Sequence, residues 1–384
     1  MTFKRLAIIA LFPTTVLAAQ PQEIHIGLAS NFSEVSTGSS NPYGGYFKDG
    51  VTLALGKFES RLKKKNLSII LDEFDYGNSD IKVLDATKKA IASKAIAVLG
   101  YNYSSNALLA APLHQQAKLP MLTPSASAVR LGTMGRYIHM AGFDNSFMGE
   151  ALGRLARTKL KAKRALVLPA ADCAYCNDLA SSFEKSFAAS GGVIAATIPV
   201  LLDDKDFSGI IDRIKSVDFD VVLIPNQELT SARMIAALSK AGIKKPFLGA
   251  DGWGNVGQEF FGILKGINFT GYSASHWHPD LKTAKSNQFV TEYQKAFGKI
   301  PNDTSVLAYD ATLLLLGAIL DSKSYTREGV EDALNALKSF DGVTGHFELK
   351  PNRAPQKSII LLKANQSKFR IVEQIDPKQL GGRK

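Results

Sequence analysis

Residues 98–131 read VLGYNYSSNALLAAPLHQQAKLPMLTPSASAVRL, and this segment says most about how the chain folds. A short apolar strand ends at Gly100, a helix opens at Ser104, and a second strand, 119–122, runs into a Thr-Pro-Ser-Ala-Ser turn. Strands of one α/β unit end at the same edge of a sheet, so both turns should bring hydroxyls and free backbone N–H groups there. Such an edge can bind an anion. The alternative is an ordinary βαβ unit whose Ser and Thr residues cap helix starts.

Strand and helix patterns alternate along the chain from residue 23 onward. A first series has strands expected at 23–29, 67–74 and 95–99, separated by helices at 44–58, 81–93 and 105–117. The alternation pauses at 137–144 and resumes in a second series, which is followed by helices and a hairpin-like tail. Alternation at this spacing predicts parallel sheets covered by helices on both faces. At 384 residues the chain is also too long for one compact core, so two lobes are expected.

The first 19 residues are typical of a secretory signal peptide. Lys4 and Arg5 precede an apolar run at 6–17, and Val-Leu-Ala at 16–18 forms a small-residue cleavage site. No cysteine follows that site, so no lipid anchor is expected, and no later run reaches the roughly 20 apolar residues of a membrane span. The mature chain is therefore expected to be a soluble protein of the periplasm.

The formal net charge of the chain is +11. Its basic residues are scattered and are not interleaved with aromatic residues, so a nucleic-acid partner is not expected. The charge is interpreted as an aid to solubility and an attraction for anionic surfaces or ligands.

The motifs and their order resemble those of type I periplasmic solute-binding proteins, the family of the leucine/isoleucine/valine-binding protein. Beyond residues 98–131, the resemblance rests on NPYGGYF at 41–47, DCAY at 172–175, DFS at 206–208, FLGADG at 247–252 and YDA at 309–311. The chain departs from the family at Cys176, where glycine is usual, and lacks the Ser-Gly-Pro that precedes the first loop.

The resemblance implies an α/β fold of two doubly wound parallel-sheet lobes joined by three interlobe crossings. In this division residues 23–143 and 277–345 form the N-terminal lobe, and residues 144–276 and 346–384 form the C-terminal lobe. Periodicity alone does not predict this threading.

The resemblance also implies a ligand site between the lobes. Ser104, Ala126 and Ser127 match positions that bind a carboxylate through hydroxyl and backbone N–H groups, and Asp251 matches the acidic residue that pairs with an α-ammonium group. For Asp251 the alternative is a turn residue in Asp-Gly.

Aromatic residues match positions in the walls of that site, namely Tyr43, Tyr103 and Tyr175. They would pack against the ligand while their hydroxyls hold polar groups or water. The alternative is that they are partly buried tyrosines on the lobe surface.

The cysteines of the chain, Cys173 and Cys176, have C-x-x-C spacing. In an exported chain this spacing favours a short-range disulfide over a thioredoxin-like dithiol or half of a zinc site. His276 and His278 form an H-x-H pair without a third ligand nearby, so we expect exposed interlobe histidines and not a metal site. No metal or cofactor is expected.

The resemblance implies the substrate-binding component of an ABC importer, which would bind an amino acid or related small molecule by lobe closure. Its partner would be a membrane permease, and the chain would be a monomer without enzymatic activity. Two alternatives stay open. One is a periplasmic ligand sensor or envelope-assembly partner of the same fold, and the other is a thiol oxidoreductase that uses the C-x-x-C pair.

Overall fold

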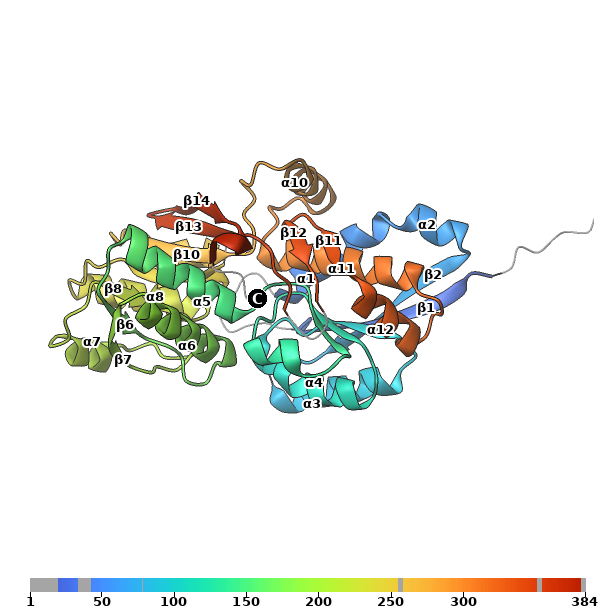
Figure 1. Ribbon diagram of the computed structural model, residues 1–384, viewed down its shortest axis with the longest axis horizontal. Coiled ribbons are helices and arrows are strands. Elements are labelled where there is room, and N and C mark those ends of the chain that lie inside the picture. Colours follow the sequence, from blue (N-terminus) through green and yellow to red (C-terminus); the bar gives the residue numbers. More distant parts are fainter. Residues whose placement is uncertain (1–19, 34–42, 78, 255–257, 351–353, 381–384) are drawn as a thin grey trace, which may run out of the picture.

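Two α/β bodies lie side by side along the long axis of the molecule (Figure 1). The structure is a computed structural model, which describes residues 20–33, 43–77, 79–254, 258–350 and 354–380. The expected signal peptide at 1–19 lies outside the described residues.

The first sheet has five parallel strands in the order β2-β1-β3-β4-β5. They are β1 (Gln22–Ser30), β2 (Leu67–Asp75), β3 (Ala97–Gly100), β4 (Met121–Thr123) and β5 (Ile138–Met140). Strand β5 falls where the alternation pauses, because three residues are too few to show a periodic pattern.

Helices cover both faces of this sheet, since a parallel sheet is apolar on both sides. In β3, Ala97 and Leu99 pack in one core and Val98 packs in another, as successive strand residues point to opposite faces. The first core includes α1 (Tyr43–Gly56), α2 (Glu59–Lys64), α11 (Asp303–Asp321) and α12 (Arg327–Ala336); the second includes α3 (Asp80–Ala92) and α4 (Ser104–Gln116). Helix α10 (Ala284–Phe297) packs on α1 and α11.

The second sheet has seven strands in the order β14-β13-β10-β9-β8-β6-β7. Strands β6 to β10 are parallel, and β13 and β14 join antiparallel at one edge. The strands are β6 (Arg164–Val167), β7 (Val193–Thr197), β8 (Val221–Leu223), β9 (Phe247–Gly249), β10 (Gly271–Ser275), β13 (Ile359–Asn365) and β14 (Lys368–Ile375). The helices around it are α5 (Asn145–Arg154), α6 (Ala174–Ala189), α7 (Ser208–Ile214), α8 (Glu228–Lys240) and α9 (Gln258–Ile263).

The chain passes between the two bodies three times, as the fold resemblance implies. It leaves the first sheet after β5, returns after β10 to form α10, α11 and α12, and leaves again after a small hairpin. That hairpin is β11 (Ser339–Asp341) paired with β12 (His346–Glu348). The predicted class, two parallel-sheet α/β lobes joined by three crossings, is therefore confirmed.

Helix α11 is, within the described part of the chain, the one helix long and apolar enough to cross a membrane. Its most apolar 18-residue window is 83% buried inside the protein. It is the central helix of the first lobe's core, where it packs along α1.

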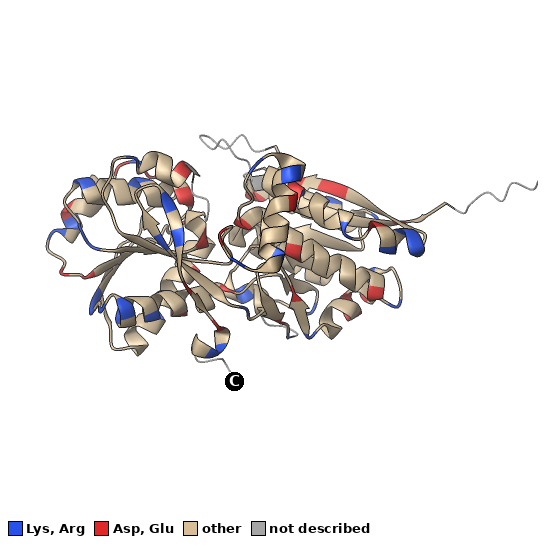
Figure 2. Cartoon of the chain, turned by 90° about the horizontal axis from the view of Figure 1, so that it is seen from above, with Lys and Arg blue, Asp and Glu red and all other residues tan. Residues whose placement is uncertain are grey.

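Lysine and arginine residues are distributed over the helices and strands of both lobes (Figure 2). Several are paired at the surface, such as Arg136 with Asp332 at 2.6 Å and Lys299 with Asp49 at 2.7 Å. Exposed pairs of this kind each contribute about 0–1 kcal/mol.

A buried polar network joins two of the crossings. The Asp310 carboxylate accepts hydrogen bonds from Val343 N–H at 2.8 Å and from Thr344 N–H and Oγ1 at 2.9 and 2.8 Å. Lys357 Nζ donates to Thr344 Oγ1 at 2.6 Å and lies 5.5 Å from the ring centroid of Phe143 on the first crossing. Burial lowers the pKa of Lys357 to about 7, although the charges of Asp310, Asp303 and Asp251 oppose that shift.

We expect Lys357 to make stability depend on pH. Between its native pKa of about 7 and its ordinary value of 10.5, the unfolded chain binds a proton that the native chain does not. The free energy of unfolding should therefore rise with pH in this window, by at most about 1.4 kcal/mol per pH unit. Urea unfolding between pH 7 and pH 9.5 should show that Lys357→Met removes this rise. The control is Lys363→Met, which removes an exposed lysine of β13. An equal dependence of the unfolding free energy on pH in both variants would contradict the expectation.

Candidate functional site

A pocket lies where the carboxyl ends of strands from both sheets face each other, as expected for ligand sites in open α/β sheets. The residues that line it follow β3, β4, β6, β8 and β9 or begin α11. They are Asn102, Tyr103, Ser104, Ser125, Ser127, Tyr175, Gln227, Asp251, Gly252, Asp303, Thr304 and Leu307. Of the residues expected from the sequence, Tyr103, Ser104, Ser127, Tyr175 and Asp251 thus lie together.

One expected residue is placed differently, and for another the expectation stays a prediction. Ala126 is buried and is not among the residues that line the pocket. Tyr43 begins α1, and its side chain lies outside the described part of the structure.

The first-lobe turn is held by hydrogen bonds within the protein. Ser104 Oγ accepts from the backbone N–H groups of Ser127 and Ala128 at 3.2 and 3.1 Å, and Ala126 N–H donates to Thr123 Oγ1 at 3.1 Å. Ser127 Oγ donates to Asn145 Oδ1 at 2.8 Å. The sequence analysis expected free N–H groups in this turn, whereas neighbouring hydroxyls already bind those of 126 and 127. The carboxylate-binding roles of Ser104, Ala126 and Ser127 stay predictions.

The alternative that Ser104 caps its own helix is also wrong. Tyr103 occupies the N-cap position of α4, without a side-chain cap hydrogen bond, and Ser104 is the first helical residue. Its hydroxyl instead ties α4 to the turn that follows β4.

The second-lobe side of the pocket is built around Asp251, which starts a short 3₁₀ turn, Asp251–Trp253, directly after β9. Tyr175 OH donates to Asp251 Oδ1 at 2.8 Å and accepts the Gly252 N–H at 3.0 Å. A Cβ on Gly252 would lie 2.9 Å from the Tyr175 ring, so glycine permits this approach. Below the turn, buried Trp253 donates from Nε1 to the Ile224 carbonyl at 2.9 Å. Tyr175 thus binds the Asp251 carboxylate, and Tyr175 and Trp253 fix the turn that carries it.

The prediction that His276 and His278 are exposed is wrong, since they are only 1% and 5% exposed. The crossing that carries them runs between the lobes, where His276 stacks on Phe143 with ring centroids 3.9 Å apart. Its Nε2 lies 3.4 Å from Asp251 Oδ2, and burial lowers the pKa of His276 to about 4. At pH 7 the His276 imidazole that lies beside the Asp251 carboxylate is therefore neutral. No group of three or more His, Cys, Asp or Glu suited to a metal occurs among the described residues.

Sequence analysis missed Asp303, the first residue of α11, which lines the pocket from the first lobe. Ser275 Oγ donates to Asp303 Oδ2 at 3.1 Å. Burial first, and then the charge of Asp251, raise the pKa of Asp303 well above its usual value. The Asn-Asp-Thr-Ser run at 302–305 marks a helix start, but only the second crossing brings that start to the pocket.

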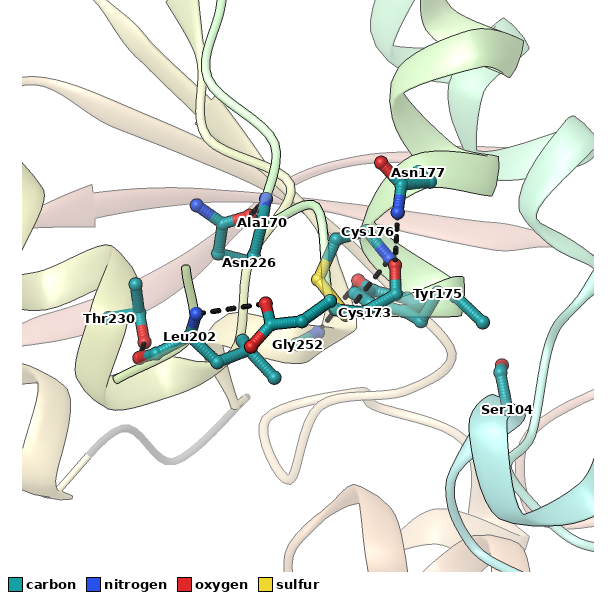
Figure 3. Close-up of a disulfide and its surroundings, with 12 residues drawn as sticks. Ser104, Ala170, Cys173, Tyr175, Cys176, Asn177, Leu202, Asn226, Thr230 and Gly252 are labelled. Carbon is teal, nitrogen blue, oxygen red and sulfur yellow. Dashed lines mark hydrogen bonds between the residues drawn. A yellow bond between two sulfur atoms is a disulfide. The ribbon is translucent and has the colours of Figure 1, made fainter. Parts of the chain in front are cut away.

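The expected disulfide between Cys173 and Cys176 is confirmed (Figure 3). Cys173 is the N-cap of α6, and its sulfur accepts the Cys176 N–H at 3.1 Å. Asn177 Nδ2 donates to the Cys173 carbonyl at 2.9 Å. The closed loop contains Tyr175, so it fixes the helix start that directs this ring toward Asp251.

Ser104→Ala should destabilise the unliganded protein. It removes the acceptor of two buried N–H groups, at Ser127 and Ala128, and an unsatisfied buried group costs about 1–3 kcal/mol. Urea denaturation should show this loss, whereas Ser181→Ala on the exposed side of α6 should change little. An equal free energy of unfolding in the two variants would show that the hydrogen bonds from Ser127 and Ala128 to Ser104 do not stabilise the turn.

The disulfide should be complete but contribute little to stability. Alkylation of the native protein without reductant, read by mass spectrometry, should label neither cysteine. Because the loop spans only a sequence separation of 3, the double variant Cys173→Ala, Cys176→Ala should lose no more than about 2 kcal/mol of unfolding free energy. Two readily alkylated thiols in the native protein would contradict the bridge.

Residues 23–368 match the periplasmic binding protein family. The Leu/Ile/Val-binding protein homolog 6 of Brucella suis biovar 1 is 23% identical over 355 residues, which cover 88% of this chain and 85% of that protein. The leucine-binding protein LivK of Thermotoga maritima has a TM-score of 0.84 at 22% identity, over 92% of this chain and 99% of its own.

Two further solved structures contain ligands. LivJ of Streptococcus pneumoniae, in complex with isoleucine, has a TM-score of 0.82 at 24% identity and covers 93% of this chain and 100% of its own. A solute-binding protein of R. palustris, in complex with benzoate, has a TM-score of 0.78 at 23% identity, with coverages of 91% and 96%. By its family match and its shared two-lobed fold, the chain belongs to the periplasmic binding protein family.

Proposed function

We propose that the chain is the exported substrate-binding component of an ABC importer and binds an amino acid or a related small amine between its lobes. The observation that carries the proposal is the Asp251 carboxylate at the pocket. It accepts from Tyr175 at 2.8 Å and lies 3.4 Å from His276, while the hydroxyl-rich turns of the other lobe line the facing wall. A carboxylate fixed in this way suits an ammonium group.

The lining favours an amine over an aromatic acid such as the benzoate bound by the R. palustris protein. Asp251 and Asp303 both line the pocket, and no lysine, arginine or histidine is among the described residues that do so. An anion without an ammonium group would face the Asp251 carboxylate with no cation among the described lining residues, which is unfavourable in a partly desolvated site. An ammonium group removes this conflict.

Ligand binding would act by closing the lobes. We propose the division 23–143 with 277–345 and 144–276 with 346–384, although the β11–β12 pairing holds 346–348 beside the first lobe. The lobes already touch at one rim, where Val129 N–H donates to Asp178 Oδ2 at 2.7 Å. A ligand can contact both walls only when the lobes are closed. Its binding therefore shifts the population of the protein toward the closed form.

In this proposal residues 1–19 direct export to the periplasm and are removed, and the closed monomer docks to a membrane permease. The chain itself performs no catalysis. The thiol oxidoreductase alternative loses its support, because Cys173 and Cys176 are both buried and bonded to each other in a fold unlike thioredoxin. A ligand sensor or envelope-assembly partner of the same fold would use the same pocket, and growth on the ligand after deletion of the permease distinguishes transport from sensing.

Asp251→Asn should weaken amine binding by about 2–5 kcal/mol, as for the loss of one partner from a buried hydrogen-bonded charge pair. A thermal-shift screen of amino acids and small amines finds the ligand, because a compound at about 100 times its Kd stabilises the native state by about 2.7 kcal/mol. Calorimetry then measures the variant. Asp212→Asn, an exposed carboxylate of the same lobe, is the control, and unchanged affinity in folded Asp251→Asn would remove this role.

A further inference from the structure

The first turns of helix α6 contact the first lobe outside the pocket. Val129 N–H, at the start of a 3₁₀ turn (Val129–Thr133), donates to Asp178 Oδ2 at 2.7 Å. Ala174 N–H, at the first residue of α6, donates to Ser105 Oγ of α4 at 3.4 Å. None of these four residues is among the described residues that line the pocket. The two hydrogen bonds therefore join the lobes through protein groups alone.

The bond at Asp178 is the shorter of the two, and its length lies at the short end of the usual range for N–H···O bonds. Val129 and Asp178 are both half-buried, and the first crossing lies between them in the chain. Neither residue lies on a crossing, so a movement that opens the lobes would separate them. The bond can therefore form only while the lobes are together.

Bonds within the second lobe hold the start of α6 in place. The Cys173–Cys176 disulfide closes the first turn of this helix. Asn145, fully buried at the start of α5, donates from Nδ2 to the Tyr175 carbonyl of the same turn at 3.4 Å. Asp178 follows three residues after Tyr175, so its carboxyl group meets Val129 from a helix start that is already fixed. A contact of this kind costs less conformational entropy than one made from a free loop.

The negative charge of Asp178 does not strengthen this contact. Burial raises the pKa of Asp178 above its usual value, and the charge of Asp144 adds to the rise, although a hydrogen bond from the Val129 N–H opposes it. Because the surroundings disfavour the ionised form, the contact depends on an acceptor oxygen and not on a charge. A neutral side chain that places an oxygen at the same point should accept the Val129 N–H as well.

Building on the proposed closure of the lobes, we propose that Asp178 is a positioning residue, which stabilises the closed form by accepting the Val129 N–H. Asp178 does not line the pocket, so it sets how often the lobes are closed and not which ligand fits. A ligand that binds only the closed form has an apparent Kd that is inversely proportional to the closed fraction. Loss of this bond should therefore weaken every ligand by the same factor, whatever the chemistry of that ligand.

The test compares Asp178→Ala with Asp178→Asn by calorimetry, with L-isoleucine, L-lysine and benzoate as probes. For each probe that binds the wild-type protein, Asp178→Ala should raise the Kd about tenfold, because the half-buried Val129 N–H loses its acceptor. Asp178→Asn, which keeps an acceptor oxygen, should restore the wild-type Kd. Asp212→Ala, at an exposed carboxylate of the same lobe, is the control. An unchanged Kd in Asp178→Ala, or an equal loss in both variants, would overturn the proposal.

Hydrogen exchange tests the same bond without any ligand. In NMR spectra of the wild-type protein and of Asp178→Asn, the Val129 amide should be protected, whereas in Asp178→Ala it should exchange about tenfold faster. The Leu131 amide, which donates to the Ala128 carbonyl at 3.0 Å in the same turn, is the internal control and should exchange alike in all three proteins.

Fast exchange of the Val129 amide in the wild-type protein, or unchanged exchange in Asp178→Ala, would overturn the role of Asp178 even if amines bind. Failure of isoleucine and lysine to bind, together with a protected Val129 amide, would count against the proposed amine-binding function and leave the role of Asp178 standing. The two proposals can therefore fail separately.

Discussion

The meeting of two parallel sheets at their carboxyl ends is the constraint on which the rest of the structure depends. Parallel strands need helical returns, so each sheet is covered on both faces and leaves its strand ends as the place for turns. The turns after β3 and β4 face those after β6, β8 and β9 across one pocket. Most polar groups of the site therefore come from turns that follow buried strands, whereas Asp303 and Thr304 come from the start of α11.

The two walls of the pocket differ in which of their polar groups already have partners within the protein. On the first lobe, hydroxyls already bind the backbone N–H groups of the turn at 126–128. On the second lobe, Tyr175 donates to Asp251 and His276 lies 3.4 Å from it, but a carboxylate is left at the pocket. The negative charge is thus fixed in advance, which favours a cationic group and reduces the reorganisation that binding requires.

The crossings connect this charge to the region about which the lobes would move. His276 contacts Asp251 through Nε2 and stacks on Phe143 of the first crossing. Lys357 lies against the same Phe143 ring and binds Thr344, which in turn donates to Asp310 of α11. All three segments that join the lobes therefore share one buried cluster. A change in the charge at Asp251 therefore changes the electrostatic energy of this cluster, because charges on buried groups are poorly screened by salt.

The sequence by itself determined the local elements and the residues placed at strand ends. Periodicity located most strands and helices, and the family resemblance pointed to Ser104, Tyr175 and Asp251, which the structure places along one pocket. The C-x-x-C pair in an exported chain was enough to predict the disulfide. Strand β5 was not predicted, because three residues are too few to show a periodic pattern.

Only the tertiary structure decided which distant segments meet. It buried His276 against Phe143, 133 positions earlier in the chain, and brought Asp303 to a pocket whose opposite wall is formed by Asp251. It also placed Lys357 beside Thr344 and satisfied the N–H groups that the sequence suggested were free. The physical reason is that strand and helix patterns report which face of an element is buried, whereas the partner of that face is set by the path of the three crossings, which leaves no periodic signal in the sequence.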